Sequence, residues 1–242
     1  MLETTTPARA WRVVLEHIER DLLEGRLGPG DRLPSERDLA ADLGVGRSSV
    51  REAVRVLEVM GLIRTATGSG PQSGAIVIAT PSGGLSVLLR LQVAAQGFPL
   101  ADVMRTRLVL EDAVTASLAD DDARDTTDVH RMLDAMDAAD LTAEEFLVLD
   151  AQLHLALAES SGNSVIAAMM AGLRSAIESY VLTGSQAIAD WPAMEAKLRA
   201  EHHGIVDAID VGDADLARKL VRDHITGYYT SAGLTSATHS SH

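Results

Sequence analysis

Residues 33–63 read LPSERDLAADLGVGRSSVREAVRVLEVMGLI and constrain the fold more than any other stretch of the chain. A serine precedes apolar residues at helical spacing, which is typical of a helix N-terminus. Gly44 and Gly46 interrupt this pattern, and Ser48 and Ser49 then open a second run with its apolar residues on one face. We therefore predict two short helices joined by a tight turn, which is the arrangement of a helix-turn-helix.

The second predicted helix carries several arginines. Arg47, Arg51 and Arg55 are spaced four residues apart, so they lie along one side of that helix. An arginine can bind guanine through two hydrogen bonds or grip a phosphate. Hydroxyls and backbone amides at a helix start, here those of Ser48 and Ser49, can also bind phosphate. The pattern is that of a helix that reads the major groove.

The charge of the chain is distributed unevenly. The net charge is −14, which by itself argues against nucleic acid. However, residues 1–80 hold ten arginines and eleven acidic residues, a net charge of about −1, so most of the acidity lies in the remaining residues. Because phosphate attraction is local and is screened beyond about 8–10 Å, an acidic second domain does not forbid DNA binding.

The flanking segments complete a predicted winged helix-turn-helix domain over residues 8–80. Apolar periodicity predicts a further helix at residues 8–25. Short strands are expected at residues 61–65 and 75–78, with a glycine-rich loop between them. The order of three helices followed by a hairpin is that of a winged helix-turn-helix.

Residues 81–84, Pro-Ser-Gly-Gly, are the best candidate linker, and no β pattern follows them. Residues 85–232 are predicted to form an all-α domain, an antiparallel bundle because its helices are joined by short breaks. The chain as a whole is therefore expected to be mainly α, and residues 233–242 are expected to be a disordered tail. The predicted bundle helices span residues 85–97, 101–119, 124–139, 142–161, 164–184, 192–211 and 213–232.

The amino-acid composition indicates the cellular compartment in which the protein works. The chain has no cysteine, so it has neither disulfides nor thiolate metal ligands. No apolar run approaches the roughly 20 residues that a membrane span needs, and the N-terminus lacks the pattern of a signal peptide. We expect a cytoplasmic protein with no membrane partner.

Four side chains of the predicted bundle are candidates for a metal site. Asp150 and His154 lie four residues apart on one helical face, and His202 and His224 each follow an inward apolar stripe. A carboxylate is costly to bury unless it is paired or bound to metal. Imidazole and carboxylate ligands suit Zn²⁺, Ni²⁺, Mn²⁺ or Fe²⁺. The alternative is a metal-free core in which hydrogen bonds satisfy each histidine.

Residues 33–63 closely resemble the DNA-binding domain of GntR-type bacterial transcription regulators. The helical half resembles the FCD ligand-binding domain of the FadR subfamily, and the two resemblances together cover roughly residues 8–230. The family resemblance implies that Arg37, Arg47 and Arg51 contact operator DNA. The alternative is that these arginines are solvated or pair with neighbouring acidic side chains.

The predicted wing departs from the family pattern. Regulators of this type usually have a short glycine-rich wing with a basic or polar tip. Here residues 67–74, TGSGPQSG, form a longer loop without positive charge. We expect Gly68 or Gly70 to approach the minor groove through its backbone, and the alternative is a disordered loop.

The FCD resemblance also implies an effector site. The metal pattern of that domain, Asp-x3-His with two later histidines, is matched by the four candidate ligands described above. Arg107 matches a segment whose arginine often faces the cavity, where it would bind an organic acid bidentately. An ion pair with Glu111 is the alternative. Asn163 matches a family position, although a helix cap explains it more simply.

These expectations describe a metabolite-responsive transcription regulator, a repressor, that binds double-stranded operator DNA as a homodimer. Its effector would be a small organic acid or sugar acid held at the metal. A second possibility is a constitutive DNA-binding regulator whose helical half only dimerises. A metallohydrolase is least favoured, because Glu159 should point away from His154 and no His-Glu-x-x-His pattern occurs. We therefore expect no enzymatic activity.

Overall fold

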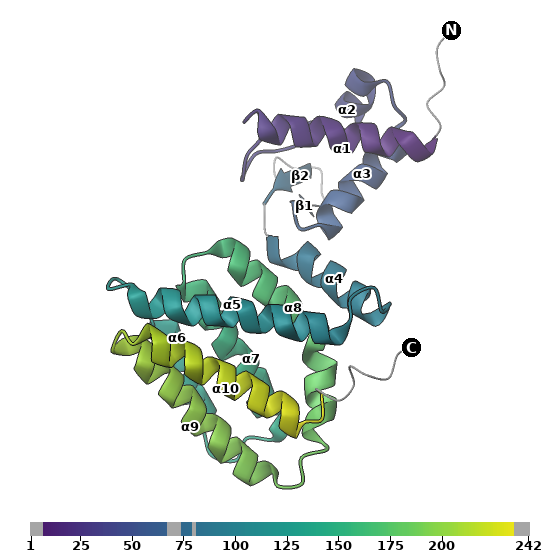
Figure 1. Ribbon diagram of the computed structural model, residues 1–242. Coiled ribbons are helices and arrows are strands. Elements are labelled where there is room, and N and C mark those ends of the chain that lie inside the picture. Colours follow the sequence, from purple (N-terminus) through teal and green to yellow (C-terminus); the bar gives the residue numbers. More distant parts are fainter. Residues whose placement is uncertain (1–6, 67–73, 79–80, 235–242) are drawn as a thin grey trace. The chain divides into compact units, whose positions relative to one another are not determined.

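The computed structural model describes residues 7–66, 74–78 and 81–234 of the chain (Figure 1). The chain divides into two compact units, Met1–Leu85 and Ser86–His242. Each unit has its own hydrophobic core, so each is described separately.

The predicted linker is helical instead of irregular. Residues 81–84 form the first turn of helix α4, Pro81–Ala94. Proline is accepted in a first helical turn because its missing N–H would have no partner there, and the apolar residues that follow continue the helical pattern. Of the predicted tail, residues 235–242 lie outside the described residues.

The first unit has the order of elements predicted for a winged helix-turn-helix. It contains the helices α1 (Pro7–Leu23), α2 (Glu36–Leu43) and α3 (Arg47–Val59), followed by the strands β1 (Ile63–Ala66) and β2 (Gly74–Val77). The strands pair antiparallel, with the first residue of β1 opposite the last residue of β2. The described part of the predicted hairpin is therefore confirmed.

Local sequence explains how α2 and α3 begin and end. The side chain of Ser35 accepts a hydrogen bond from the backbone N–H of Asp38 at 3.2 Å, which caps α2. Gly44 ends α2 in the left-handed conformation, with φ of 65°, which glycine adopts at little cost. Gly46 is the N-cap of α3, which begins at Arg47, one residue earlier than the sequence pattern suggested.

The apolar faces of these helices meet the hairpin in a single small core. Helix α3 packs against both α1 and α2, so its outer face alone is left for another partner. The buried core residues are Val14, Ile18, Leu33, Leu39, Val50, Ala53, Val54, Leu57, Ile63 and Val77.

The second unit is helical throughout its described residues, which confirms the predicted fold class. Most of α4 belongs to it, followed by six further helices. These are α5 (Leu100–Asp120), α6 (Thr127–Met136), α7 (Ala143–Ser160), α8 (Ser164–Ser185), α9 (Trp191–Asp210) and α10 (Ala214–Ser231).

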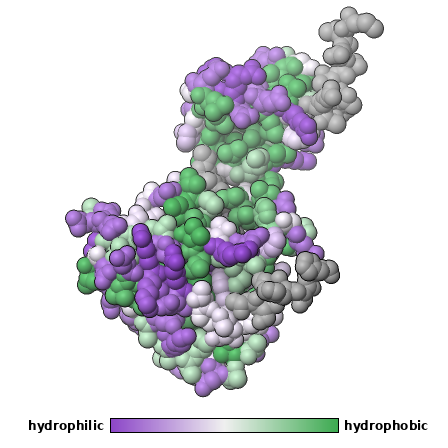
Figure 2. Space-filling model, viewed as in Figure 1, coloured by the Kyte–Doolittle hydropathy of each residue, from purple (hydrophilic) through white to green (hydrophobic). Residues whose placement is uncertain are grey.

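Helix α10 shows how the bundle is held together. It packs against α5 and α9 (Figure 1), while α7 packs against α6 and α8. The inner face of α10 buries Val221, Ile225 and Tyr228. Its outer face carries charged residues such as Arg222, and the corresponding surface is hydrophilic in Figure 2. Such two-sidedness is what a helix at the surface of a bundle requires.

Helix α8 is long and apolar enough to cross a membrane by length and composition alone. It packs against α5 and α7, and it contributes Met170, Leu173, Ala176 and Ile177 to the core of the second unit. Its apolar composition is thus accounted for by packing inside the helical unit.

Candidate DNA-reading helix and metal centre

The exposed face of α3 carries most of the predicted DNA contacts. The side chains of Arg47, Ser48, Arg51 and Arg55 are exposed along this helix. Ser49 is different, because it is only 8% exposed and belongs to the buried face. Its position in the helical register turns it toward the core, so the structure does not bring its hydroxyl to the outer surface.

An acidic residue of α2 holds Arg51. Two nitrogens of the Arg51 guanidinium, Nε and Nη2, donate to the two carboxylate oxygens of Glu36, at 3.3 and 2.9 Å. Arg37, also on α2, donates from Nε to Asp38 at 3.2 Å. Two of the three arginines predicted to contact DNA, Arg37 and Arg51, therefore make the ion pairs that were the alternative to DNA contact, yet both remain exposed. Exposed pairs of this kind are weak and can be exchanged for phosphate or base contacts.

Gly68 and Gly70, the alternative wing contacts predicted from the sequence, lie outside the described residues. The strands on either side of that loop are in place. The backbone approach assigned to one of these glycines stays a prediction.

Three helices bring the predicted metal ligands together. Asp150 and His154 come from α7, His202 from α9 and His224 from α10. One ligand atom from each residue lies within 4.8 Å of the others. The Nε2 atom of His202 is 3.0 Å from Oδ1 of Asp150, and 3.2 Å from Nε2 of His224. The convergence expected from the inward stripes is therefore present.

Two further carboxylates orient the imidazole rings. Oε2 of Glu111, on α5, is 3.0 Å from Nδ1 of His154, and Oε2 of Glu201, on α9, is 3.0 Å from Nδ1 of His224. Burial raises the pKa of each glutamate, but the adjacent imidazole together with a cation, Arg107 for Glu111 and Lys197 for Glu201, more than offsets this, so the pKa lies below its usual value. Both carboxylates are thus ionised and can only accept hydrogen bonds. The Nδ1 atoms must therefore be the donors.

This proton arrangement suits a cation. With both Nδ1 atoms directed at carboxylates, the Nε2 atoms of His154 and His224 face each other at 3.3 Å. A cation bound there would accept a lone pair from each Nε2 atom. Histidine metal ligands commonly donate their other ring N–H to a carboxylate, as both do here. The residues present therefore fit a divalent ion.

The other two ligands are in the charge state that a metal requires. Burial and the neighbouring His224 together lower the pKa of His202 to about 4, against the raising effect of Asp150, so its ring is neutral at pH 7. Burial raises the pKa of Asp150, but the hydrogen bond from His202 and the nearby imidazoles outweigh it and hold the pKa far below its usual range. Metal ligands need neutral imidazole and ionised carboxylate.

A pocket opens beside the cluster. It lies between α7 and α8, and most of its lining is apolar. Asp150, His154 and Arg107 line it. Arg107 is almost fully buried, and it donates to Glu111 and to the hydroxyl of Tyr229, both at 3.1 Å. The cavity position and the ion pair, predicted as alternatives for Arg107, therefore occur together.

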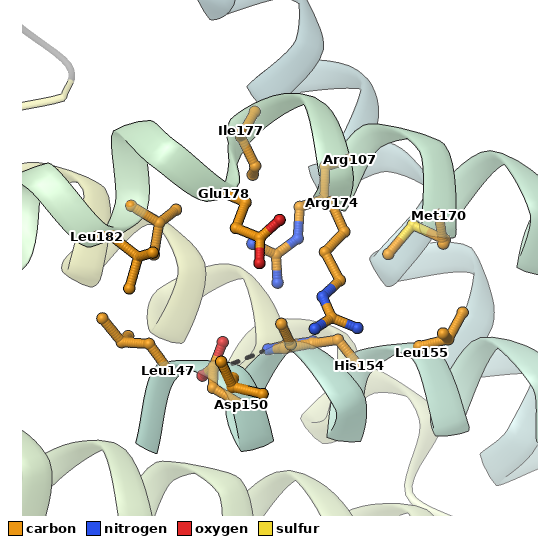
Figure 3. A pocket seen from close by; sticks show the side chains of 13 residues that line it. Arg107, Leu147, Asp150, His154, Leu155, Met170, Arg174, Ile177, Glu178 and Leu182 are labelled. Atoms are coloured by element: carbon orange, nitrogen blue, oxygen red, sulfur yellow. Dashed lines mark ion pairs between the residues drawn. The ribbon is translucent and has the colours of Figure 1, made fainter. Parts of the chain in front are cut away.

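The sequence patterns missed the far wall of the pocket. Arg174 and Glu178 of α8 face Asp150 and His154 of α7 across the pocket (Figure 3). Both residues lie within a run of α8 whose periodicity predicts only a helix. A charged pair four residues apart is usually a solvated helix face, so nothing in the sequence distinguished it.

Asn163, the second predicted effector residue, is instead a helix cap. Its side-chain oxygen accepts hydrogen bonds from the backbone N–H groups of Val165 and Ile166, at 3.1 and 3.2 Å, at the start of α8. It is not among the residues that line the pocket. The simpler of its two interpretations therefore accounts for its position.

Two family descriptions match this chain. Residues 12–71 match "Bacterial regulatory proteins, gntR family", and residues 102–227 match "FCD domain". The chain belongs to the GntR family. The resemblance inferred from the helix-turn-helix and from the histidine pattern is thus confirmed. GntR-family regulators of this kind bind operator DNA, and they bind small-molecule effectors through the FCD domain.

Relatives of this GntR-family chain are transcription regulators. It is 30% identical over 206 residues to the "HTH-type transcriptional regulator LutR" of Bacillus subtilis (strain 168), covering 84% of this chain and 91% of the relative. It is 29% identical over 219 residues to the "Glc operon transcriptional activator" of Escherichia coli (strain K12), covering 88% and 85%. The solved structure "Streptococcus agalactiae GntR" shares its fold, with a TM-score of 0.62 at 24% identity, covering 93% of this chain and all of that one.

Proposed function

We propose that this transcription regulator is a cytoplasmic repressor that binds operator DNA as a homodimer and is released by a small organic acid. The acid binds in the pocket of the helical unit, against a divalent metal ion. A helix-turn-helix dimer reads two half-sites about one helical turn apart, roughly 34 Å. Relatives include both a repressor, NanR of Citrobacter rodentium, and the activator named above, so the direction of control is tested below.

The DNA contacts are assigned to the exposed residues of the helix-turn-helix. Arg47 and Arg51 at the start of α3 would reach base edges or phosphate, with Ser48 beside them and Arg37 on α2 gripping the backbone. The exposed, arginine-bearing face of α3 supports this assignment, since the opposite face is buried in the core. Arg51→Ala should abolish operator binding and leave acid-induced shifts of the melting temperature intact.

The metal site is assigned to Asp150, His154, His202 and His224. When bound there, Zn²⁺, Ni²⁺, Mn²⁺ or Fe²⁺ would supply the positive charge that attracts a carboxylate. Arg107 lies in the same pocket, and its guanidinium is fixed by Glu111 and Tyr229, so it is oriented before any acid arrives. A carboxylate there would gain charge-assisted hydrogen bonds at small cost in side-chain entropy.

The observation that carries this proposal is the convergence of three imidazole nitrogens and one carboxylate oxygen beside an arginine-lined pocket. We would first measure the metal content of the purified protein. Its melting temperature would then be followed with L-lactate, D-gluconate and other carboxylates, since a ligand that binds only the folded state raises it.

Each outcome has a defined meaning. Bound metal, an acid-induced rise in melting temperature, and loss of operator retention on adding the same acid would support a metal-dependent repressor. Tighter operator binding with the acid would refute the proposed direction of control. Protein that carries no metal, binds none when it is supplied, and responds to no acid would refute the proposed effector site and favour constitutive DNA binding.

A further inference from the structure

Arg174 and Glu178 on the far wall of the pocket have opposite charges but do not form an ion pair with each other. Arg174 is half-buried, and Glu178, one turn further along α8, is exposed. Neither makes a hydrogen bond or an ion pair to any of the described residues, although the two side chains interact electrostatically. By contrast, Arg107 and Glu111, which are also four residues apart on α5, do form an ion pair, at 3.1 Å.

An open pair in a pocket leaves hydrogen-bonding capacity for a ligand. Burial lowers the pKa of Arg174, which shows that its charge is under-compensated where it stands. A half-buried guanidinium without a partner is costly, and an incoming acceptor would offset that cost. Glu178 offers an acceptor oxygen beside it. The pair is therefore one donor group and one acceptor group on the same wall.

The charge of the pocket limits what the ligand carries. Its charged lining residues are two arginines, Arg107 and Arg174, and two carboxylates, Asp150 and Glu178. A second carboxylate would contact Arg174 but be repelled by Glu178, and an ammonium group would meet the reverse situation. A hydroxyl suits both residues, because it accepts from the guanidinium and donates to the carboxylate.

We propose that Arg174 and Glu178 form a second subsite that binds a hydroxyl at the far end of the effector, which makes the effector a hydroxylated monocarboxylate. This inference rests on the proposed function, in which the carboxylate end binds near Arg107 and Asp150. The wall between the two ends is apolar and would cover a carbon chain. Its residues include Leu147, Ile177, Val181 and Leu182.

The test is calorimetric titration of the full-length, metal-loaded protein. The probes are D-gluconate, with hydroxyls far from its carboxylate, L-lactate, whose one hydroxyl is next to its carboxylate, and adipate, with a second carboxylate. Arg174→Met and Glu178→Met remove the polar ends with little change in side-chain length. Glu159→Met is the matched control, since Glu159 is exposed on α7 and outside the pocket.

We expect D-gluconate to bind the wild-type protein more tightly than adipate. Each pocket variant should weaken D-gluconate about tenfold, the loss expected for a hydrogen bond to a charged group, and leave L-lactate within about twofold. The control should change neither affinity.

Two results would overturn the subsite alone: adipate binding as tightly as D-gluconate, or variants that weaken both hydroxy acids equally. L-lactate binding with no effect of either variant on D-gluconate would also refute it, while the proposed function stands. If none of the three acids binds, the carboxylate site itself is refuted and the subsite with it.

Discussion

At the scale of single residues, the pair between Glu36 and Arg51 bears directly on DNA recognition. Glu36 accepts from Nε and Nη2 of the guanidinium, and Nη1 donates to none of the described residues. A side chain held in this way loses less freedom when it binds a base, so its contact can discriminate between sequences.

We therefore expect Glu36→Gln to lower the ratio of operator affinity to non-specific affinity by about tenfold, since one good arginine–guanine contact contributes about 1–3 kcal/mol of discrimination. Fluorescence anisotropy with a selected duplex and a scrambled duplex at equal salt would measure it. Asp42→Asn is the control, because Asp42 is an exposed acidic residue of the same helix. An unchanged ratio in Glu36→Gln would show that Glu36 does not position Arg51.

Glu201 would act on the proposed metal site through His224. It accepts from Nδ1 of that ring, which fixes the ring orientation. Partners of this kind typically contribute 10- to 100-fold to metal affinity. We expect Glu201→Gln to weaken Zn²⁺ by about that factor in a competition titration with a chelating dye, and to leave DNA binding unchanged. Equal Zn²⁺ affinity in the variant and the wild type would contradict this role. Glu144→Gln, at an exposed position of α7, is the matched control.

At the scale of elements, α8 depends on its cap. Asn163 satisfies two of the N–H groups that have no partner inside the helix. We expect Asn163→Ala to lower the free energy of unfolding by about 1 kcal/mol, measured by urea denaturation, with effector affinity unchanged. Asn163→Asp, which keeps a capping oxygen, should restore most of the loss. A variant of normal stability that no longer binds the acid would instead place Asn163 in the effector site.

Helices and turns could be predicted because their signals are local. The apolar spacing of α3 and the glycines before it lie within a few residues, and the inward stripes of His202 and His224 follow from the helical period. The charged wall of the pocket could not be predicted, since Arg174 faces Asp150 only after α8 packs on α7. The burial of Ser49 follows from the same period, because Ser49 lies four residues before the buried Ala53 and therefore on the apolar face of α3.

At the scale of the whole molecule, the metal would join three helices of the second unit and none of the first. We therefore expect chelation to lower the melting temperature of the helical unit alone, and Zn²⁺ to restore it. At a free metal concentration 100 times the dissociation constant, the stabilisation is about 2.7 kcal/mol. Differential scanning calorimetry of the full chain with and without chelator would measure this. A melting curve that is identical under both conditions would exclude a bound metal.

The four metal ligands also set a condition on synthesis. His154 and His224 are separated by 70 positions, and His224 lies in the final described helix. The proposed site therefore cannot be complete until the ribosome has released α10. Chains cut before α10 would keep the helix-turn-helix but lose one of the four proposed metal ligands.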